Sequence, residues 1–359
     1  RFLYSGYGFS PRDAVPFTRP DEINAANTNV LALDREIWAL WEGGSPYRLD
    51  RGDLSTIGPK TFGGDLSGLP FSAHPKRDRN GDLWNFGGFG PRLILWRLGS
   101  GGDLISATPL DLPQSTLMHD FAITVRHIVL IAPPMREAGG EAASLIDRFV
   151  WSPAESTTVL VVDKDDPRAV RTYELPAKFL FHIGNAYETR DGAVHIDAFL
   201  FDDPSFAIRD SREMPQGVRA RPPAARPTLI RLDADGSARL ETLPGTGEFP
   251  RIDPRRQGAR QRYTYGVIAG GCGRWDWRGG RQRTYEAGAT FWAEEPVFVP
   301  RRGADAESAG WILQTRLNLG TEKTELLIFD ARAIEDGPIA ELECAYPLPL
   351  GFHGAFAPF

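Results

Sequence analysis

Short apolar or alternating runs recur along most of the chain, and each run is closed by Gly, Pro, Asn or Asp. Alternation of polar and apolar side chains followed by turn residues is typical of β-strands and hairpins. The pattern therefore predicts strands in a series of stretches: 36–44, 92–99, 121–134, 158–167, 179–188, 194–203, 228–236, 263–271, 311–320 and 324–332.

The spacing of these stretches predicts an all-β protein. Helical periodicity is scarce between them, and 38 Gly and 29 Pro favour turns. Many short strands at nearly regular spacing are typical of a sandwich, a barrel or a propeller. For 359 residues a propeller fits best, and we expect a single domain over residues 1–359. No repeat of fixed length is visible, so the spacing predicts no blade number.

Composition and charge narrow the class of protein. The formal net charge is −6 and no long Lys/Arg run occurs, which argues against a nucleic-acid partner. No apolar run has the length of a membrane span and no signal peptide is visible, although the chain starts with Arg1. Two cysteines, Cys272 and Cys344, are too few for a disulfide framework. We expect reduced thiols and a cytoplasmic location.

Four of the six histidines have unusual neighbours at turn signals or strand ends: His74, His119, His182 and His353. Neutral imidazole is a common ligand of iron, zinc and copper. Inner strands of a propeller each direct side chains to its axis, so four such residues could meet there. Spacing alone leaves a shared metal site and separate buried histidines both open.

The words around these histidines carry a family resemblance. In order along the chain stand "AHPKRDRNGDLWNFG", "MHDFAIT", "FHIGNAYE", "EEPVFVPR", "ELLIFDAR" and "GFHGAF". Together they resemble the carotenoid cleavage oxygenases. The resemblance implies a seven-bladed β-propeller with Fe(II) on its axis, loops covering one face, and the four histidines as metal ligands. A propeller hydrolase using calcium would instead need oxygen ligands.

The resemblance also implies three glutamates behind the histidines, at Glu42, Glu248 and Glu295. A carboxylate that accepts the outer N–H of a metal-bound imidazole fixes its tautomer and ring angle. The competing interpretation places these glutamates at the surface, because glutamate is seldom buried unpaired.

The activity implied by the resemblance is oxidative cleavage of a C=C bond by O2, giving two carbonyl products. Thr28 would lie beside a vacant iron position, and Trp41, Leu117 and Phe181 would face the substrate cavity. Trp41 stands where stilbene-cleaving members tend to carry Lys, and an apolar indole suits a hydrocarbon chain. The expected substrate is therefore a carotenoid or apocarotenoid polyene.

Several alternatives stay open. A stilbene-cleaving dioxygenase and an isomerase that inserts no oxygen lie within the same family, and a non-catalytic propeller that binds partners lies outside it. Because polyenes reside in membranes, the resemblance also implies peripheral membrane contact. Only 26 residues precede Asn27, so the N-terminal part of the family fold is expected to be missing here.

Overall fold

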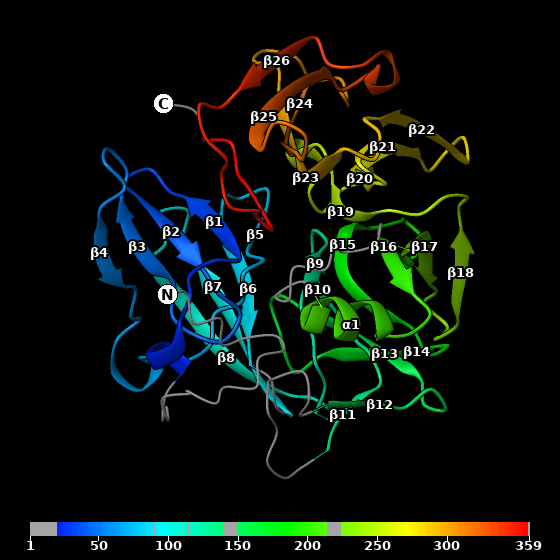
Figure 1. The fold of residues 1–359 in the computed structure, drawn as a ribbon. Coiled ribbons are helices and arrows are strands. Elements are labelled where there is room, and N and C mark those ends of the chain that lie inside the picture. Colours follow the sequence, from blue (N-terminus) through cyan, green and yellow to red (C-terminus); the bar gives the residue numbers. More distant parts are fainter. Residues whose placement is uncertain (1–19, 89–90, 114, 139–148, 214–223, 358–359) are drawn as a thin grey trace. The chain divides into compact units, whose positions relative to one another are not determined.

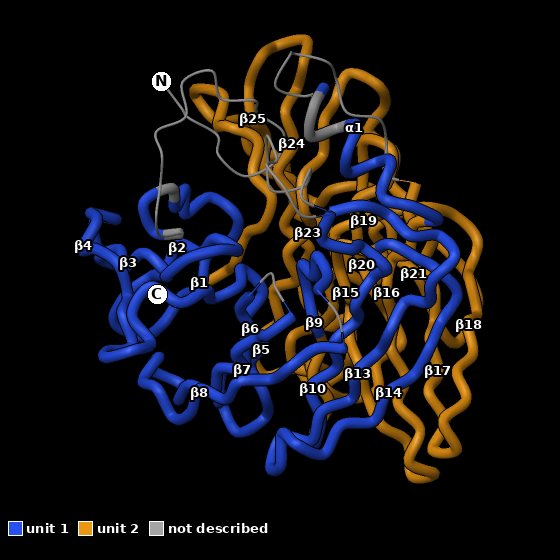
Figure 2. Tube along the Cα trace, turned by 90° about the horizontal axis from the view of Figure 1, so that it is seen from below, with its two compact units in different colours: residues 1–121, 126–179, 202–221 blue, residues 122–125, 180–201, 222–359 orange. Residues whose placement is uncertain are grey.

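The computed structural model describes residues 20–88, 91–113, 115–138, 149–213 and 224–357. The chain divides into two compact units, which are coloured separately in Figure 2. Unit 1 comprises residues 1–121, 126–179 and 202–221, and unit 2 comprises residues 122–125, 180–201 and 222–359.

Unit 1 begins with two four-stranded sheets in which each strand pairs with the next along the chain (Figure 1). The paired strands are antiparallel, as expected where short turns connect them. The first sheet comprises β1 (Asn29–Ala32), β2 (Glu36–Leu40), β3 (Tyr47–Asp50) and β4 (Thr56–Pro59). The second comprises β5 (Lys76–Arg77), β6 (Leu83–Gly87), β7 (Arg92–Leu98) and β8 (Leu104–Asp111).

A third sheet has the order β14-β13-β10-β9, and a separate two-stranded ribbon interrupts it in sequence. The sheet comprises β9 (Phe121–Ile123), β10 (His127–Ala132), β13 (Thr157–Asp163) and β14 (Val170–Leu175), and the ribbon comprises β11 (Met135–Glu137) and β12 (Phe149–Trp151). All six residues of β10 are buried. Burial of both faces explains the continuous apolar run "IVLIA" after His127.

Three fully buried aromatic side chains, Trp38, Phe71 and Trp96, form the centre of a core in unit 1. The rings of Trp38 and Phe71 meet edge to face with centroids 6.1 Å apart. Both indole N–H groups are satisfied, because Trp38 donates to Glu36 (2.6 Å) and Trp96 donates to the carbonyl of Pro70 (2.9 Å). This core anchors the segment that leads to His74.

Unit 2 contains three further four-stranded sheets, again with each strand beside the next along the chain. The first comprises β15 (Phe179–Glu188), β16 (Val194–Phe201), β17 (Arg226–Leu232) and β18 (Ala238–Thr242). The second comprises β19 (Glu248–Arg251), β20 (Tyr263–Ile268), β21 (Gly271–Asp276) and β22 (Arg281–Glu286). The third comprises β23 (Phe291–Pro300), β24 (Gly310–Asn318), β25 (Lys323–Asp330) and β26 (Ala340–Glu343).

The last of these sheets shows how local pattern becomes tertiary packing. Buried and less buried residues alternate along the first seven residues of β24, as a strand with one face in the core requires. Phe298, Phe329 and Tyr265 pack in the same core, and the Tyr265 hydroxyl donates to the carbonyl of Ala331 (2.8 Å). The ring is thereby buried without an unsatisfied polar group.

The described residues thus contain six four-stranded sheets of the kind that form propeller blades, together with the ribbon. The prediction of seven blades is wrong for this part of the chain, because β11 and β12 pair with each other and add no blade. The single domain, the axial iron and the covering loops stay predictions.

The described residues also contain a few short helical elements. After β16 comes α1 (Ser205–Glu213), and four 3-10 turns are described: η1 (Pro20–Ile23), η2 (Gly64–Leu66), η5 (Pro254–Arg256) and η6 (Ile334–Asp336). The Asp203 carboxylate accepts the N–H of Ser205 (2.8 Å), which satisfies one of the free donors at the start of α1. Among the described helices, none has both the length and the apolar character of a membrane span.

Candidate metal centre

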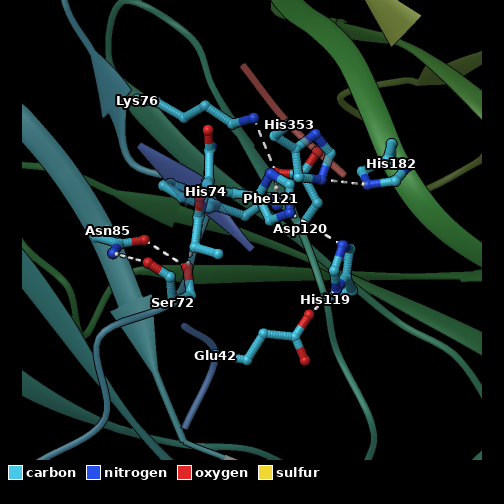
Figure 3. A network of polar contacts seen from close by, with 12 residues as sticks. Glu42, Ser72, His74, Lys76, Asn85, His119, Asp120, Phe121, His182 and His353 are labelled. Atoms are coloured by element: carbon cyan, nitrogen blue, oxygen red, sulfur yellow. Dashed lines mark hydrogen bonds and ion pairs between the residues drawn. The ribbon is translucent and has the colours of Figure 1, made fainter. Parts of the chain in front are cut away.

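In unit 1 the structure brings two of the predicted histidines into contact. His74 lies between η2 and β5, and His119 lies between β8 and β9. Their Nε2 atoms are 2.9 Å apart and their ring centroids 4.5 Å apart. His74 is 5% exposed and the side chain of His119 is 13% exposed; Figure 3 shows the two residues with their neighbours.

A buried polar network holds the backbone before His74. The Ser72 hydroxyl and the Asn85 side chain are 2.6 Å apart, and the Asn85 amide also donates to the Ser72 carbonyl (2.8 Å). From β1, the Asn29 amide donates to the Ala73 carbonyl (2.7 Å). These contacts fix the backbone before His74 and thereby the direction of the His74 side chain (Figure 3).

Carboxylates lie beside both rings of this pair. Glu42, which follows β2 and is 7% exposed, contacts the Nδ1 of His119. Asp120 lies 3.8 Å from the Nδ1 of His74, and Lys76 pairs with the same Asp120 oxygen at 2.8 Å. The sequence prediction missed Asp120 and Lys76, although Asp120 stands inside the quoted "MHDF" word.

In unit 2 the other two predicted histidines are also in contact. His182 lies on β15 and His353 follows β26, yet their Nε2 atoms are 3.1 Å apart. The rings are edge to face, with centroids 4.8 Å apart. Phe249 contacts both rings, at 4.9 and 5.3 Å between centroids. An apolar wall therefore adjoins the pair.

Each histidine of unit 2 has a buried glutamate at its other nitrogen. Glu248 lies 2.6 Å from the Nδ1 of His182, and Glu295 lies 2.8 Å from the Nδ1 of His353. Both glutamates occur at irregularities in strand pairing, one between β19 and β20 and one between β23 and β24. A bulge redirects side chains, and Phe249 beside it has the left-handed φ of 54°.

The charge on Glu295 is stabilised although the residue is buried. Burial would raise the pKa of this carboxyl, but Arg251 and His353 together with the N–H of Gly354 hold it below its usual value. Arg251 lies 3.0 Å from one carboxylate oxygen, and the N–H of Gly354 donates to the same oxygen at 3.0 Å. Glu295 is therefore an anion beside His353.

The segment that carries His353 is tied down by contacts that the sequence prediction missed. Glu294 accepts the N–H of Gly351 (2.5 Å) and the hydroxyl of Thr315. Arg251 donates to the carbonyl of Gly354. The consecutive residues Glu294 and Glu295 thus bind two points, Gly351 and Gly354, of the segment that carries His353. In the sequence, the only signal for these contacts is the pair of glutamates before a proline in "EEP".

The donor set of unit 2 suits a metal cation. If the Nδ1 atoms donate to carboxylates, both Nε2 atoms present lone pairs, which repel each other at 3.1 Å unless a cation lies between them. Two nitrogens at right angles around an ion, each at about 2.1 Å, lie about 3.0 Å apart. Imidazole is a suitable ligand for iron, copper and zinc alike.

The remaining predicted site residues are placed as follows. Thr28 is 9% exposed and donates its N–H to the Leu40 carbonyl (3.0 Å). Trp41, which precedes Glu42 in the sequence, is buried. Leu117, two residues before His119, is also buried. Phe181 is half-buried, with its ring centroid 6.0 Å from that of His182. Their roles at oxygen or substrate stay predictions.

The family model described as retinal pigment epithelial membrane protein matches residues 1–358. The chain belongs to the carotenoid cleavage oxygenase family. That family includes oxygenases of carotenoids, apocarotenoids and stilbenes. The family resemblance inferred from the sequence motifs is thus confirmed.

Individual relatives share about a quarter of their residues with this member of the family. Isoeugenol monooxygenase of Pseudomonas nitroreducens is 26% identical, covering 93% of this chain and 75% of the relative. Lignostilbene-alpha,beta-dioxygenase isozyme III of Sphingomonas paucimobilis is 28% identical (92% and 74%). Apocarotenoid-15,15'-oxygenase of Synechocystis is 28% identical (93% and 73%).

Solved structures agree with the fold. The crystal structure of cobalt-substituted Synechocystis ACO has a TM-score of 0.84 and 25% identity, covering 98% of this chain and 78% of that chain. This likeness supports the all-β propeller of the family. That related protein was crystallised in a cobalt-substituted form.

Proposed function

We propose that this member of the family is a non-haem Fe(II) dioxygenase that cleaves a C=C bond of a carotenoid or apocarotenoid with O2. In this proposal His74, His119, His182 and His353 supply one nitrogen each to a single ion. The observation that carries the proposal is that three of these imidazoles contact a buried carboxylate with Nδ1 and keep Nε2 for a metal.

The carboxylates have two functions in this proposal. By accepting Nδ1–H they hold each imidazole neutral and in one tautomer, which keeps the Nε2 lone pair available. Glu42, Glu248 and Glu295 also offset the charge of a divalent ion whose direct ligands are all neutral. Bound iron(II) would supply the activation of O2, and no nucleophilic side chain is required.

The protein's remaining task is to position an apolar substrate and exclude water. Phe249 is an apolar surface beside the unit 2 pair, and Trp41 is a buried aromatic residue adjacent in sequence to Glu42. A rigid apolar surface holds a polyene in register and strengthens electrostatic interactions by removing water. We assign Trp41, Leu117 and Phe181 to this surface and Thr28 to the oxygen position.

The metal assignment is tested by iron content. We expect about one iron per chain in the wild type, and loss of iron with retained β-sheet circular dichroism in His182→Ala, because blade packing does not depend on this ring. His127→Ala is the matched control, since His127 is a buried strand histidine outside the proposed ligand set. Normal iron content in His182→Ala would overturn the assignment.

The reaction is tested by product analysis. Iron-loaded protein is incubated with carotenoids, apocarotenals, stilbenes and isoeugenol, and the carbonyl products are identified by mass. We expect two carbonyl fragments from a carotenoid or apocarotenoid. Absence of cleavage of every substrate by the iron-loaded protein would favour a binding protein.

A second candidate is a dioxygenase of phenolic alkenes. Two relatives, isoeugenol monooxygenase and lignostilbene-alpha,beta-dioxygenase isozyme III, carry names that support it. Trp41 argues against it, because an indole donates one hydrogen bond but carries no cation for a phenolate. Cleavage of stilbenes without cleavage of polyenes would replace the first proposal by the second.

A further inference from the structure

A hollow of about 240 Å³ in unit 2 is lined by none of the proposed metal-centre residues. Four arginines line it: Arg262, Arg274, Arg281 and Arg283. Tyr263, Asp276 and Glu335 complete the lining. Such a concentration of guanidinium groups around one hollow needs an explanation, because like charges at short range destabilise the folded state.

Strand register places these charges on one face of the sheet β19–β22. Arg274 on β21 is directly opposite Arg283 on β22, and Asp276 is directly opposite Arg281. Residues directly opposite each other in antiparallel strands share a face, and like charges there are unfavourable. The two like charges of Arg274 and Arg283 therefore repel each other and lower the stability of the sheet. Strand pairing itself does not require arginine at either position.

Neighbouring carboxylates offset only part of the charge. Asp276 binds Arg262 through two contacts of 2.8 and 2.7 Å. Glu335 lies 3.5 Å from Arg274 and 3.7 Å from Arg283, which are long for ion pairs. With four positive and two negative groups in the lining, the balance is +2.

Outside the lining, Glu307 adds one negative charge near Arg262, which lowers the excess to about +1 but does not remove it. Its carboxylate accepts the main-chain N–H groups of Arg262 and Tyr263, at 2.6 and 2.9 Å. The Arg281 guanidinium forms no hydrogen bond or ion pair with any residue that the structure describes, and the side chain is exposed. At least one guanidinium is thus available to a ligand.

Two of the guanidiniums are held in place before any ligand arrives. Arg274 donates to the carbonyls of Ala331 (3.1 Å) and Arg332, and it lies 5.2 Å from the centroid of the Tyr263 ring. Arg262 lies 4.9 Å from the same centroid. Fixed donors lose little conformational entropy when they bind an anion.

We propose that this arginine-lined hollow binds a phosphate group. Guanidinium forks match phosphate oxygens in pairs, and a dianion would balance the charge of the lining. The volume exceeds that of a single phosphate, so the group is expected to belong to a phosphomonoester or to a lipid headgroup. Binding here requires neither iron nor the proposed cleavage activity.

The test measures phosphate binding by thermal shift and calorimetry. The protein is titrated with inorganic phosphate, and a titration with sodium chloride at equal ionic strength is the salt control. Binding to phosphatidylcholine vesicles is measured with and without phosphatidic acid in the vesicles. We expect the double variant Arg281→Gln/Arg283→Gln to bind at least about tenfold more weakly, because charge-assisted hydrogen bonds are lost. Both side chains are exposed, so the fold should persist.

Arg278→Gln is the matched control, since Arg278 is an exposed arginine between β21 and β22 outside the lining. Binding of inorganic phosphate that depends on Arg281 and Arg283 identifies a soluble phosphate as ligand. Dependence seen only with phosphatidic acid vesicles identifies a lipid headgroup. Absence of both, or equal binding by the double variant and wild type, would overturn the proposal.

Discussion

Glu248 and Glu295 acquire their positions through local departures from regular strand geometry. At both positions the pairing with the neighbouring strand shifts, and Phe249 after Glu248 has a positive φ. Such a φ is costly for a non-glycine residue. The cost is compatible with a functional role, because the shifted backbone directs each carboxylate at one histidine.

Replacement of Glu295 by Gln should weaken metal binding by about 10- to 100-fold. The amide oxygen can still accept the Nδ1–H of His353, but the negative charge beside the proposed ligand is lost. The measurement is a titration of the metal-free protein with Co(II), followed by its absorption. Glu241→Gln, an exposed acid on β18, is the control, and equal affinities of the two variants would contradict the assigned role.

Gly184 illustrates a different demand on a single residue. A Cβ atom here would lie 2.0 Å from a carboxylate oxygen of Asp197. We expect Gly184→Ala to lower the free energy of unfolding by about 1–3 kcal/mol, as overpacking does, measured by urea unfolding. Gly101→Ala, whose added Cβ would meet nothing closer than 3.9 Å, should change stability little. A stable Gly184→Ala variant would show that Asp197 can move.

At the scale of elements, a buried polar network joins β15 and β16 to the segment between η5 and β20. The Asn185 amide on β15 donates to the carbonyls of Arg256 (3.1 Å) and Ala259 (2.8 Å). Asp197 on β16 accepts from Gln261 and from the Thr264 hydroxyl (2.8 Å). A loop is thus fastened by side chains where no strand pairing could hold it.

This network predicts a pH-dependent stability. Burial raises the pKa of Asp197 to about 7, although the hydrogen bonds from Thr264 and Gln261 act in the opposite direction. The folded state therefore retains a proton that the unfolded chain releases near pH 4. The contribution of Asp197 to the free energy of unfolding is therefore fully present below about pH 4. It decreases by up to about 4 kcal/mol as the pH rises from 4 to 7.

Asp197→Asn should flatten this dependence, since an amide mimics the protonated acid. The measurement is urea unfolding at several pH values between 4 and 8, with Asp65→Asn, an exposed aspartate, as the control. A slope that is unchanged in Asp197→Asn would exclude Asp197 as its source.

At the scale of the whole molecule, each proposed ligand pair is built from distant parts of the chain. His74 and His119 are 45 residues apart, and His182 and His353 are 171 residues apart. The last strand, β26, ends at Glu343, and the following segment is held by Glu294 and Glu295. In the described structure this segment lies outside the sheets, and it carries the proposed ligand His353.

Deletion of residues 352–359 should abolish iron retention while leaving the fold intact. The deletion removes His353 but no strand residue. Iron content and the thermal midpoint are the measurements, and deletion of residues 356–359, which keeps His353, is the control. Stoichiometric iron in the longer deletion would show that His353 is dispensable.

The sequence by itself determined the strands and the candidate ligands. Alternation of polar and apolar residues in stretches such as 311–320 is a local property of the chain. The motifs around the four histidines and three glutamates can likewise be identified from the sequence alone. Only the tertiary structure decided which nitrogen faces which carboxylate, that β11 and β12 form a ribbon, and that four arginines share a hollow. These features depend on strand register and bulges, which arise from contacts between residues far apart in the chain and leave no local pattern.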